Sequence, residues 1–220
     1  ISFVNAIAAV CEAVGADVND VVLGMGYDKR IGDAFLRPGP GWGGSCFPKD
    51  SRALVRIAED AGYDFDLLKG VITVNDDQFE RVADKVQRMV GGDLSGTTVA
   101  VWGLTFKART DDLRDSPSLQ VIRRLLARGA TVQAFDPAVD PVEGSHDSRL
   151  AGIELAADAY GAAQGAAALV VLTEWDDFRW VDLDKVAEAM THPRVVDARN
   201  LLDRAALHRR GFEYEGIGRS

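Results

Sequence analysis

Residues 43–50 read GGSCFPKD, and they place one cysteine where nucleophilic chemistry is possible. Pro48 predicts that a helix begins beside Cys46, because proline is favoured in the first turn of a helix. Free backbone N–H groups and the helix dipole favour a thiolate there, and Lys49 adds positive charge. Asp50 falls in the same first turn, where a carboxylate can position a thiol or a water. The segment therefore predicts a catalytic cysteine.

The other candidate side chains have simpler explanations. A cysteine taken alone is more often an inert core residue, and Cys11 lies on the apolar face of an expected helix, so we assign it to the core. Two cysteines give no disulfide framework, which favours a reducing cytoplasm. The three histidines show no metal-ligand spacing, so no metal site is expected.

Composition excludes several classes of protein. The chain has 220 residues, 47% of them hydrophobic, which is ordinary for a globular protein. The net charge of −9 argues against nucleic-acid or anionic-membrane binding. No apolar run is long enough to cross a bilayer. Residues 28–56 are locally basic, which would suit an anionic small molecule, although on charge alone a solvated face is the favoured explanation.

The first part of the chain, residues 1–91, is predicted to be helical. Apolar residues at helical spacing and capping signals give four helices: an opening one that ends near residue 15, and three more at residues 18–23, 48–61 and 66–90. Asp17 is the expected cap of the second helix. Residues 24–47 form a long loop, and long loops tend to be functional. The first helical pattern starts at Ile1 without a cap, so we expect a segment on its N-terminal side to be missing.

The second part, residues 92–220, follows a glycine-rich boundary at 91–96 and has a different pattern. Strands are predicted at residues 98–103, 131–136, 168–172 and 195–197, and helices at 118–128 and 184–190. Strands that alternate with helices imply a parallel sheet covered by helices, a Rossmann-like α/β fold. Neither glycine cluster near a candidate turn completes a dinucleotide fingerprint: no strand precedes Gly24, and residues 104–107 after Gly103 contain no second or third glycine.

Several segments together resemble the UDP-glucose/GDP-mannose dehydrogenase family. They are residues 30–32, 35–50, 103–107 and 110–117, of which the cysteine loop is the most specific. The resemblance runs the whole length of the chain. It implies the family's central helical region, which dimerises, followed by its UDP-binding domain, with the N-terminal NAD-binding domain absent.

The resemblance also implies chemistry, in which the family oxidises a sugar C6 alcohol to a carboxylate with NAD. Cys46 matches the nucleophile that holds the aldehyde and then a thioester, and Asp50 the carboxylate that assists the thiol and the water. Lys49 and Arg114 match positions that contact NAD. The family's catalytic lysine and asparagine, and the water-orienting groups of the NAD domain, are expected upstream of Ile1.

A larger set of positions matches the family's substrate site. It comprises Arg30, Phe35, Leu36, Arg37, Pro38, Gly39, Gly43, Phe106, Lys107 and Arg199. Arg30 matches an arginine that some members lend to a neighbouring subunit. Taken singly, each charged residue could equally be a surface charge. Lys107 and Arg114 gain weight because they follow a strand, at the sheet end where open α/β sheets bind ligands.

Three alternatives for the function stay open. Residues 35–42 are closer to members that act on UDP-glucose than to those that act on GDP-mannose, and members that act on a UDP-N-acetyl-hexosamine are a further possibility. A protein of another class, a non-catalytic nucleotide-sugar-binding or assembly module, would need no activated thiol. We expect a homodimer or higher homo-oligomer, because apolar stripes on the first and fourth helices exceed what one small region can cover.

Overall fold

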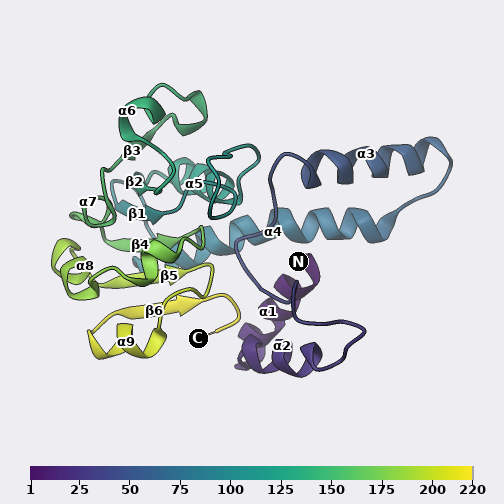
Figure 1. Ribbon diagram of the computed structural model, residues 1–220, viewed down its shortest axis with the longest axis horizontal. Helices are drawn as coiled ribbons and strands as arrows, with labels where there is room; N and C mark the ends of the chain where they lie inside the picture. The colour runs from purple at the N-terminus through teal and green to yellow at the C-terminus, as the bar shows by residue number, and fades with distance from the viewer. Residues whose placement is uncertain (220) are drawn as a thin grey trace.

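The computed structural model describes residues 1–219 and shows a helical part beside an α/β part (Figure 1). The helical part contains α1 (Ser2–Val14), α2 (Val18–Gly26), α3 (Phe47–Asp60) and α4 (Asp66–Met89). The side chain of Asp17 accepts a hydrogen bond from Asn19 N at 2.8 Å and so caps α2, as predicted. The four helices of the sequence analysis are therefore confirmed, with ends that shift by a few residues.

The α/β part is built on one parallel sheet. Its strands are β1 (Thr98–Trp102), β2 (Thr131–Phe135), β3 (Ile153–Leu155), β4 (Ala168–Val171), β5 (Arg194–Asp197) and β6 (Glu213–Gly216). They lie in the order β3-β2-β1-β4-β5-β6, and every neighbouring pair is parallel. The predicted helical region followed by a Rossmann-like parallel sheet is confirmed.

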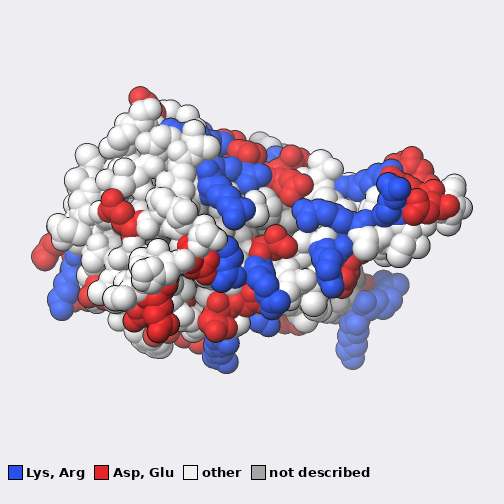
Figure 2. Space-filling view, turned by 90° about the horizontal axis from the view of Figure 1, so that it is seen from above, with Lys and Arg blue, Asp and Glu red and all other residues white. Residues whose placement is uncertain are grey.

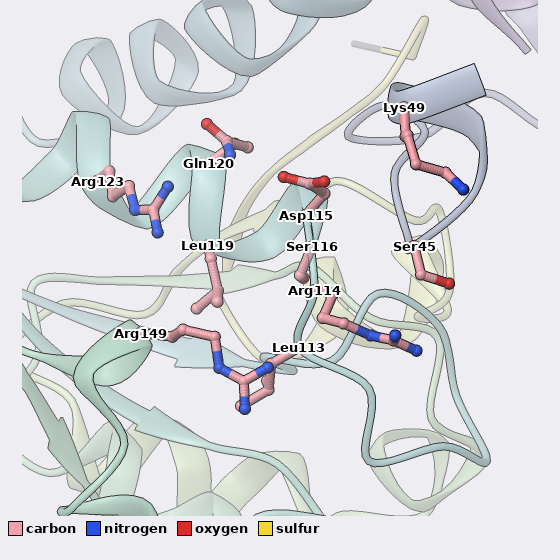
Figure 3. Close-up of a pocket in the computed structure, with 10 residues that line it drawn as sticks. All are labelled: Ser45, Lys49, Leu113, Arg114, Asp115, Ser116, Leu119, Gln120, Arg123 and Arg149. Carbon is pink, nitrogen blue, oxygen red and sulfur yellow. The ribbon is translucent and has the colours of Figure 1, made fainter. Parts of the chain in front are cut away.

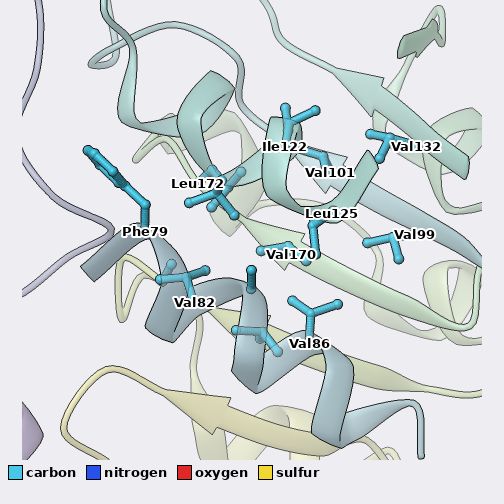
Figure 4. Packing of buried hydrophobic residues seen from close by; sticks show 14 of the residues in the cluster. Phe79, Val82, Val86, Val99, Val101, Ile122, Leu125, Val132, Val170 and Leu172 are labelled. Atoms are coloured by element: carbon cyan, nitrogen blue, oxygen red, sulfur yellow. The ribbon is translucent and has the colours of Figure 1, made fainter. Parts of the chain in front are cut away.

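Alternate residues of the central strands bury opposite faces of the sheet. Val99 and Val101 of β1 face a cluster that includes α4 and α5 (Pro117–Ala127), as Figure 4 shows from close by. Ala100 and Trp102 face a second cluster. The remaining helical segments are α6 (Pro141–Gly144), η1 (Ser148–Leu150), α7 (Ala159–Ala163), η2 (Asp176–Arg179), α8 (Leu183–Ala189) and α9 (Arg204–Arg209). Both faces are covered, as a parallel sheet requires.

Helix α4 belongs to both parts of the molecule. Its first half runs beside α3 in an arm that extends away from the sheet (Figure 1). Its second half places Val82 and Val86 in the same apolar cluster as the sheet. The division of the chain at residues 91–92 stays a prediction, since the core crosses it.

Two strands were missed by the sequence analysis, which expected four. β3 has three residues, and β6 alternates polar residues with buried ones, so neither shows the apolar run of a central strand. Both lie at the edges of the sheet. Edge strands are commonly short and polar, which weakens their signal.

A buried lysine ties the first helix to the last strand. Lys85 of α4 is 3% exposed, and its Nζ lies 2.9 Å from Glu12 and 2.7 Å from Glu215. Glu12 also accepts a hydrogen bond from Gly218 N at 2.7 Å. A buried charge is tolerated when it is paired in this way.

Candidate active site

Cys46 stands at the root of the α3 arm. It is the N-cap residue of α3, its side chain is exposed, and Asp50 N donates to its carbonyl oxygen at 2.9 Å. Ser45 Oγ lies 3.7 Å from its Sγ. The predicted position at a helix N-terminus is confirmed, although the helix begins at Phe47, one residue before Pro48. Cys11 is buried in the core, as expected.

Buried polar side chains fix the loop that leads to Cys46. Asn75 of α4 accepts from Trp42 N at 2.7 Å and donates to Trp42 O at 3.0 Å. Gln78, one turn further on, donates to Gly39 O at 2.8 Å, and Asn5 of α1 accepts from Gly39 N at 2.8 Å. Side chains that satisfy loop backbone groups in the interior hold the loop in one conformation.

Two glycines bring this loop against the α/β part. A Cβ on Gly43 would lie 2.0 Å from the carbonyl oxygen of Asp115, so only glycine fits at this crossing. Gly44, with φ of 85°, packs against the Phe106 ring, and its N–H donates to Asp115 O at 3.2 Å. Cys46 is therefore positioned by contact with the segment that follows β1.

The segment after β1 is itself anchored by a buried carboxylate. Asp136, at the end of β2, is 1% exposed and accepts hydrogen bonds from Leu104 N at 2.7 Å and Thr105 N at 2.9 Å. Gly103 has φ of 97°, and a Cβ there would meet Thr173 at 2.4 Å. The glycine at the end of β1 thus permits close packing, which agrees with our reading that it is no phosphate-binding fingerprint.

Arg199 contacts the same segment at the carbonyl oxygen of Phe106. Its Nε is 3.0 Å from Glu174 and donates to Leu172 O at 2.8 Å, while Nη2 reaches Phe106 O at 3.5 Å. Burial lowers the pKa of Arg199, against the opposing charges of Glu174 and Asp197. An arginine held this way presents a fixed charge to a ligand.

Arg199 opens onto a cleft of about 420 Å³, which we call the Arg199 cleft. Its lining residues are Asn19, Leu36, Arg37, Pro38, Glu174, Asp176, Arg179, Arg199, Asn200 and Leu201. Four predicted substrate residues, three from the cysteine loop and one from the segment after β5, are thereby brought together. Gly39 adjoins them, since a Cβ there would lie 3.5 Å from Arg199 Nη1. Lys107 lies nearby with its Nζ 5.1 Å from the Phe106 ring centroid.

A second cleft, of about 430 Å³, is bordered by Ser45 and Lys49, on either side of Cys46 in the sequence, and we call it the cationic cleft (Figure 3). It is lined by Ser45, Lys49, Leu113, Arg114, Asp115, Ser116, Leu119, Gln120, Arg123 and Arg149. Lys49 and Arg114, the two predicted NAD contacts, therefore share one cleft, and its cations suit an anionic dinucleotide. Hydrogen bonds from Arg114 hold the pKa of Asp112 at about 2, so this ion pair stays charged at neutral pH.

Three predicted residues stand apart from these two clefts. Arg30 lies exposed near the start of the connection between α2 and α3 and pairs with Asp28 at 2.6 Å. Phe35, 72% exposed, lines an apolar hollow of about 270 Å³ with Trp42 and Phe47. Asp50 is exposed and its carboxylate lies 3.3 Å from Lys49 Nζ, within the first turn of α3.

Sequence reasoning missed the residues that position the site. Asn75 and Gln78 interrupt the apolar pattern of α4, and buried polar residues at helical spacing were the available signal. Glu174 gave no signal before the fold placed it against Arg199. Within residues 1–219, no group of three or more His, Cys, Asp or Glu is arranged to hold a metal ion. None of the helices formed by these residues combines the length and apolarity needed to cross a membrane.

Comparison with known proteins assigns the chain to a family. The central domain of the UDP-glucose/GDP-mannose dehydrogenase family matches residues 1–77, and the family's UDP binding domain matches residues 100–204. UDP-glucose 6-dehydrogenase of Rhizobium meliloti is 45% identical over 221 residues, which cover 100% of this chain and 49% of that protein.

Solved structures agree. A UDP-glucose dehydrogenase from the hyperthermophilic archaeon Pyrobaculum islandicum is similar with a TM-score of 0.84 at 32% identity, covering 100% of this chain and 48% of the other. A UDP-D-ManNAc dehydrogenase from Pyrococcus horikoshii gives 0.81 at 27% identity, with the same coverage. The chain spans about half the length of the curated relatives it matches. On these matches the chain belongs to the UDP-glucose/GDP-mannose dehydrogenase family, within which it covers the central and UDP-binding domains.

Proposed function

We propose that this chain is the part of an NAD-dependent UDP-glucose 6-dehydrogenase that binds the nucleotide sugar and supplies the nucleophile for its oxidation to UDP-glucuronate. One observation carries the proposal: the glycines before Cys46 fit against Asp115 and Phe106, so an exposed thiol is held beside the same segment whose Phe106 carbonyl Arg199 reaches. The 45% identity to proteins named UDP-glucose 6-dehydrogenase supports the choice of sugar.

In this mechanism Cys46 provides covalent catalysis. Its Sγ adds to the carbon of the C6 aldehyde to give a thiohemiacetal, and loss of hydride from that carbon leaves a thioester, which water hydrolyses to the acid. Covalent attachment prevents escape of the aldehyde between the two oxidations. Asp50, one turn along α3, acts as the base for the thiol and for the water. NAD, when bound, accepts the hydride, and Lys49 and Arg114 are the residues of this chain that would hold it.

The Arg199 cleft binds the nucleotide part of the substrate in this proposal. Arg199 offers charge to the diphosphate, and its pairing with Glu174 keeps the guanidinium oriented. The remaining contacts come from the backbone and side chains of two loops, at Leu36, Arg37, Pro38, Gly39, Gly43, Phe106 and Lys107. Arg30 and Phe35 lie outside this cleft. We propose that Arg30 reaches the site of a neighbouring subunit and that Phe35 contacts the sugar nucleotide from the loop that carries Pro38.

Another nucleotide sugar is the nearest competing substrate. The likeness to a UDP-D-ManNAc dehydrogenase structure shows that the same architecture occurs in a protein named for a UDP-N-acetyl sugar. Turnover of the complete enzyme with UDP-glucose, UDP-N-acetylmannosamine and GDP-mannose separates these substrates. A preference for either of the last two would replace our assignment of the sugar while leaving the dehydrogenase chemistry in place.

A non-catalytic binding module is the competing class. Such a module needs no reactive thiol, whereas our proposal requires that Cys46 react with an alkylating reagent at near-neutral pH. The exposed Cys46 and the buried Cys11 provide an internal comparison in one chain. Equal and slow labelling of both cysteines would favour the binding module.

The 220-residue chain gives a direct test of the two halves of the proposal. We expect weak binding of UDP-glucose, because one wall of the cleft is expected to come from the NAD domain. We expect no NADH formation, since nothing in residues 1–219 provides a strand–GxGxxG–helix unit to align the nicotinamide. Calorimetry and absorbance on one sample measure both, and Arg199→Ala should abolish the binding. NADH production by this chain would contradict our domain assignment.

We also propose that the complete protein is cytoplasmic and a homodimer or higher homo-oligomer. Large apolar side chains are exposed on the helical part, among them Phe3, Val10 and Val14 on α1, Leu54 and Ile57 on α3, and Leu67 on α4. On α4 the inner part of the predicted apolar stripe, Phe79, Val82 and Val86, is buried within the chain instead. The candidate interface therefore centres on α1 and the arm.

A further inference from the structure

The cationic cleft contains two arginines that the proposed function does not use. Lys49 and Arg114 are joined there by Arg123 of α5 and Arg149 of η1 (Figure 3). Asp115 is the one carboxylate among the lining residues. A view from above shows Lys and Arg side chains gathered over the middle of the molecule, between the sheet and the α3 arm (Figure 2).

Arg149 is oriented by the same local device as Arg114. Each arginine lies two residues after an aspartate that accepts from its backbone N–H at 2.9 Å, Asp112 for Arg114 and Asp147 for Arg149. The same aspartate also accepts from the arginine Nε at 2.9 Å and from Nη2. The guanidinium is thereby fixed, and its Nη1 remains available for a ligand.

Arg114 and Arg149 are close enough for the charge of one to affect the pKa of the other. The hydrogen bond to Asp147 raises the pKa of Arg149, burial opposes that rise, and the charges of Asp112 and Arg114 act in opposite directions. The hydrogen bond to Asp112 likewise raises the pKa of Arg114, with a smaller contribution from Cys46. Each guanidinium is paired with its own aspartate, and both arginines line the cleft, so an anionic ligand there would meet two oriented cations.

Arg123 adds a charge with no compensation from the protein. Within residues 1–219 it has neither an ion pair nor a side-chain hydrogen bond, and it is exposed. The cleft volume of about 430 Å³ exceeds what a phosphate alone would fill. Asp115 can accept from sugar hydroxyls, and Gln120 and Ser45 add neutral donors. The combined chemistry matches a ribose that carries a diphosphate.

We propose that the cationic cleft binds the ribose–diphosphate portion of the dinucleotide cofactor, with Arg149 and Arg123 as phosphate-binding residues beside Lys49 and Arg114. This inference rests on the proposed function, because it assumes that a dinucleotide is the hydride acceptor. It adds Arg123 and Arg149 to the residues that would bind the cofactor, and it assigns the Asp147–Arg149 pair the function of orienting a phosphate-binding guanidinium. The Arg199 cleft remains the separate site of the nucleotide sugar.

Binding of ADP-ribose to the 220-residue chain tests the inference without enzymatic activity. We expect calorimetric binding that Arg149→Ala weakens about tenfold and Arg123→Ala about fivefold, since each removes a charge-assisted contact to phosphate. Arg56→Ala, which removes an exposed α3 arginine paired with Asp60 outside the cleft, is the matched control and should leave the affinity unchanged. Arg149→Lys should restore little, because lysine cannot copy the two-point contact with Asp147.

UDP-glucose, measured on the same variants, separates this inference from the proposed function. Unchanged UDP-glucose binding together with weakened ADP-ribose binding supports the inference. Equal ADP-ribose affinity in wild type, Arg149→Ala and Arg123→Ala would overturn it and leave the proposed function intact. Inorganic pyrophosphate that binds in an Arg149-dependent way while ADP-ribose does not would assign the cleft to a free phosphate anion and also overturn it. Loss of UDP-glucose binding by the wild-type chain would count against the proposed function instead.

Discussion

The α3 arm and the sheet are packed in opposite ways. Of the fourteen residues of α3 only Pro48 is buried, whereas four of the five residues of β1 are buried. The thiol nevertheless belongs to the arm. The contrast teaches that the arm does not position its own nucleophile: the position of Cys46 is set at the root, where Gly43 and Gly44 meet the segment after β1.

The strongest test of this contrast is removal of the thiol itself. Cys46→Ala in the complete enzyme should lower acid formation at least about a thousandfold, because the covalent route is lost. Folding and UDP-glucose binding should be unaffected, since the side chain is exposed. Cys11→Ala is the control, and it should reduce stability while turnover is retained. Turnover within a few-fold of wild type in Cys46→Ala would remove the residue from the mechanism.

A substitution at the root should disturb the site without touching a reacting group. Gly43→Ala places a Cβ against the Asp115 carbonyl and 2.8 Å from Pro117 Cδ, so the loop must move. We expect turnover to fall about a hundredfold and the free energy of unfolding to fall by about 2 kcal/mol. Gly24→Ala is matched to it, because a Cβ on Gly24 of α2 meets nothing within 4 Å. Similar effects of the two substitutions would show that the root does not position Cys46.

On the sheet side, Asp197 predicts a dependence of stability on pH. Burial raises its pKa to about 6, against the backbone hydrogen bonds of Leu202 and Arg199 and the charge of Arg219. The folded protein therefore holds this proton more tightly than the unfolded chain, whose aspartates titrate near about 4. Stability from this group is full below about pH 4 and falls by about 3 kcal/mol as the pH rises to about 6.

Unfolding by denaturant between pH 4 and pH 8 measures that dependence. The difference in the free energy of unfolding between wild type and Asp197→Asn should change over this interval and level off above about pH 6. Leu202 N and Arg199 N donate to different oxygens of Asp197, so the asparagine loses one of these hydrogen bonds at every pH, which offsets its curve without adding a dependence on pH. Parallel curves for the two proteins would mean that Asp197 titrates as it does in the unfolded chain.

The smallest expected effect concerns the apolar surface of the helical part. Phe3→Asp should weaken self-association about tenfold, because it places a charge among exposed apolar residues of α1. Trp180→Asp alters an even more exposed aromatic residue of the α/β part and should leave association unchanged. Sedimentation of both variants over a range of concentrations makes the comparison. A monomeric wild-type chain at high concentration would contradict the predicted interface.

Sequence patterns identified the four central strands of the sheet but not its two edge strands. The apolar run of residues 168–172 and the capping residue Asp17 carry local signals, so the corresponding strand and helix were predictable. Strand β6 was not predictable from the sequence. Its residue Glu215 pairs with Lys85, which lies far away in the sequence. Local propensity cannot encode such a contact.

The candidate site likewise contains features with a local sequence signal and features that depend on contacts between distant segments. Cys46 and its neighbours were found because glycine, proline and cysteine at fixed spacing have direct structural consequences. The two clefts were not, since each combines segments that only the fold brings together. The relation between Arg114 and Arg149 depends on a short turn at residues 147–150, which no periodicity reveals.

The buried ion pairs of Lys85 with Glu12 and Glu215 should hold the molecule together after its chain is cut. The exposed glycines at residues 91–92 offer a site for limited proteolysis, where a cut would separate α4 from β1. The fragments should nevertheless remain associated, because the ammonium of one contacts Glu215 of the other, and Glu12 is hydrogen-bonded to Gly218 N. Removing a partner from such a buried pair costs about 3–5 kcal/mol. A nicked molecule should therefore migrate as one species until a denaturant separates its halves.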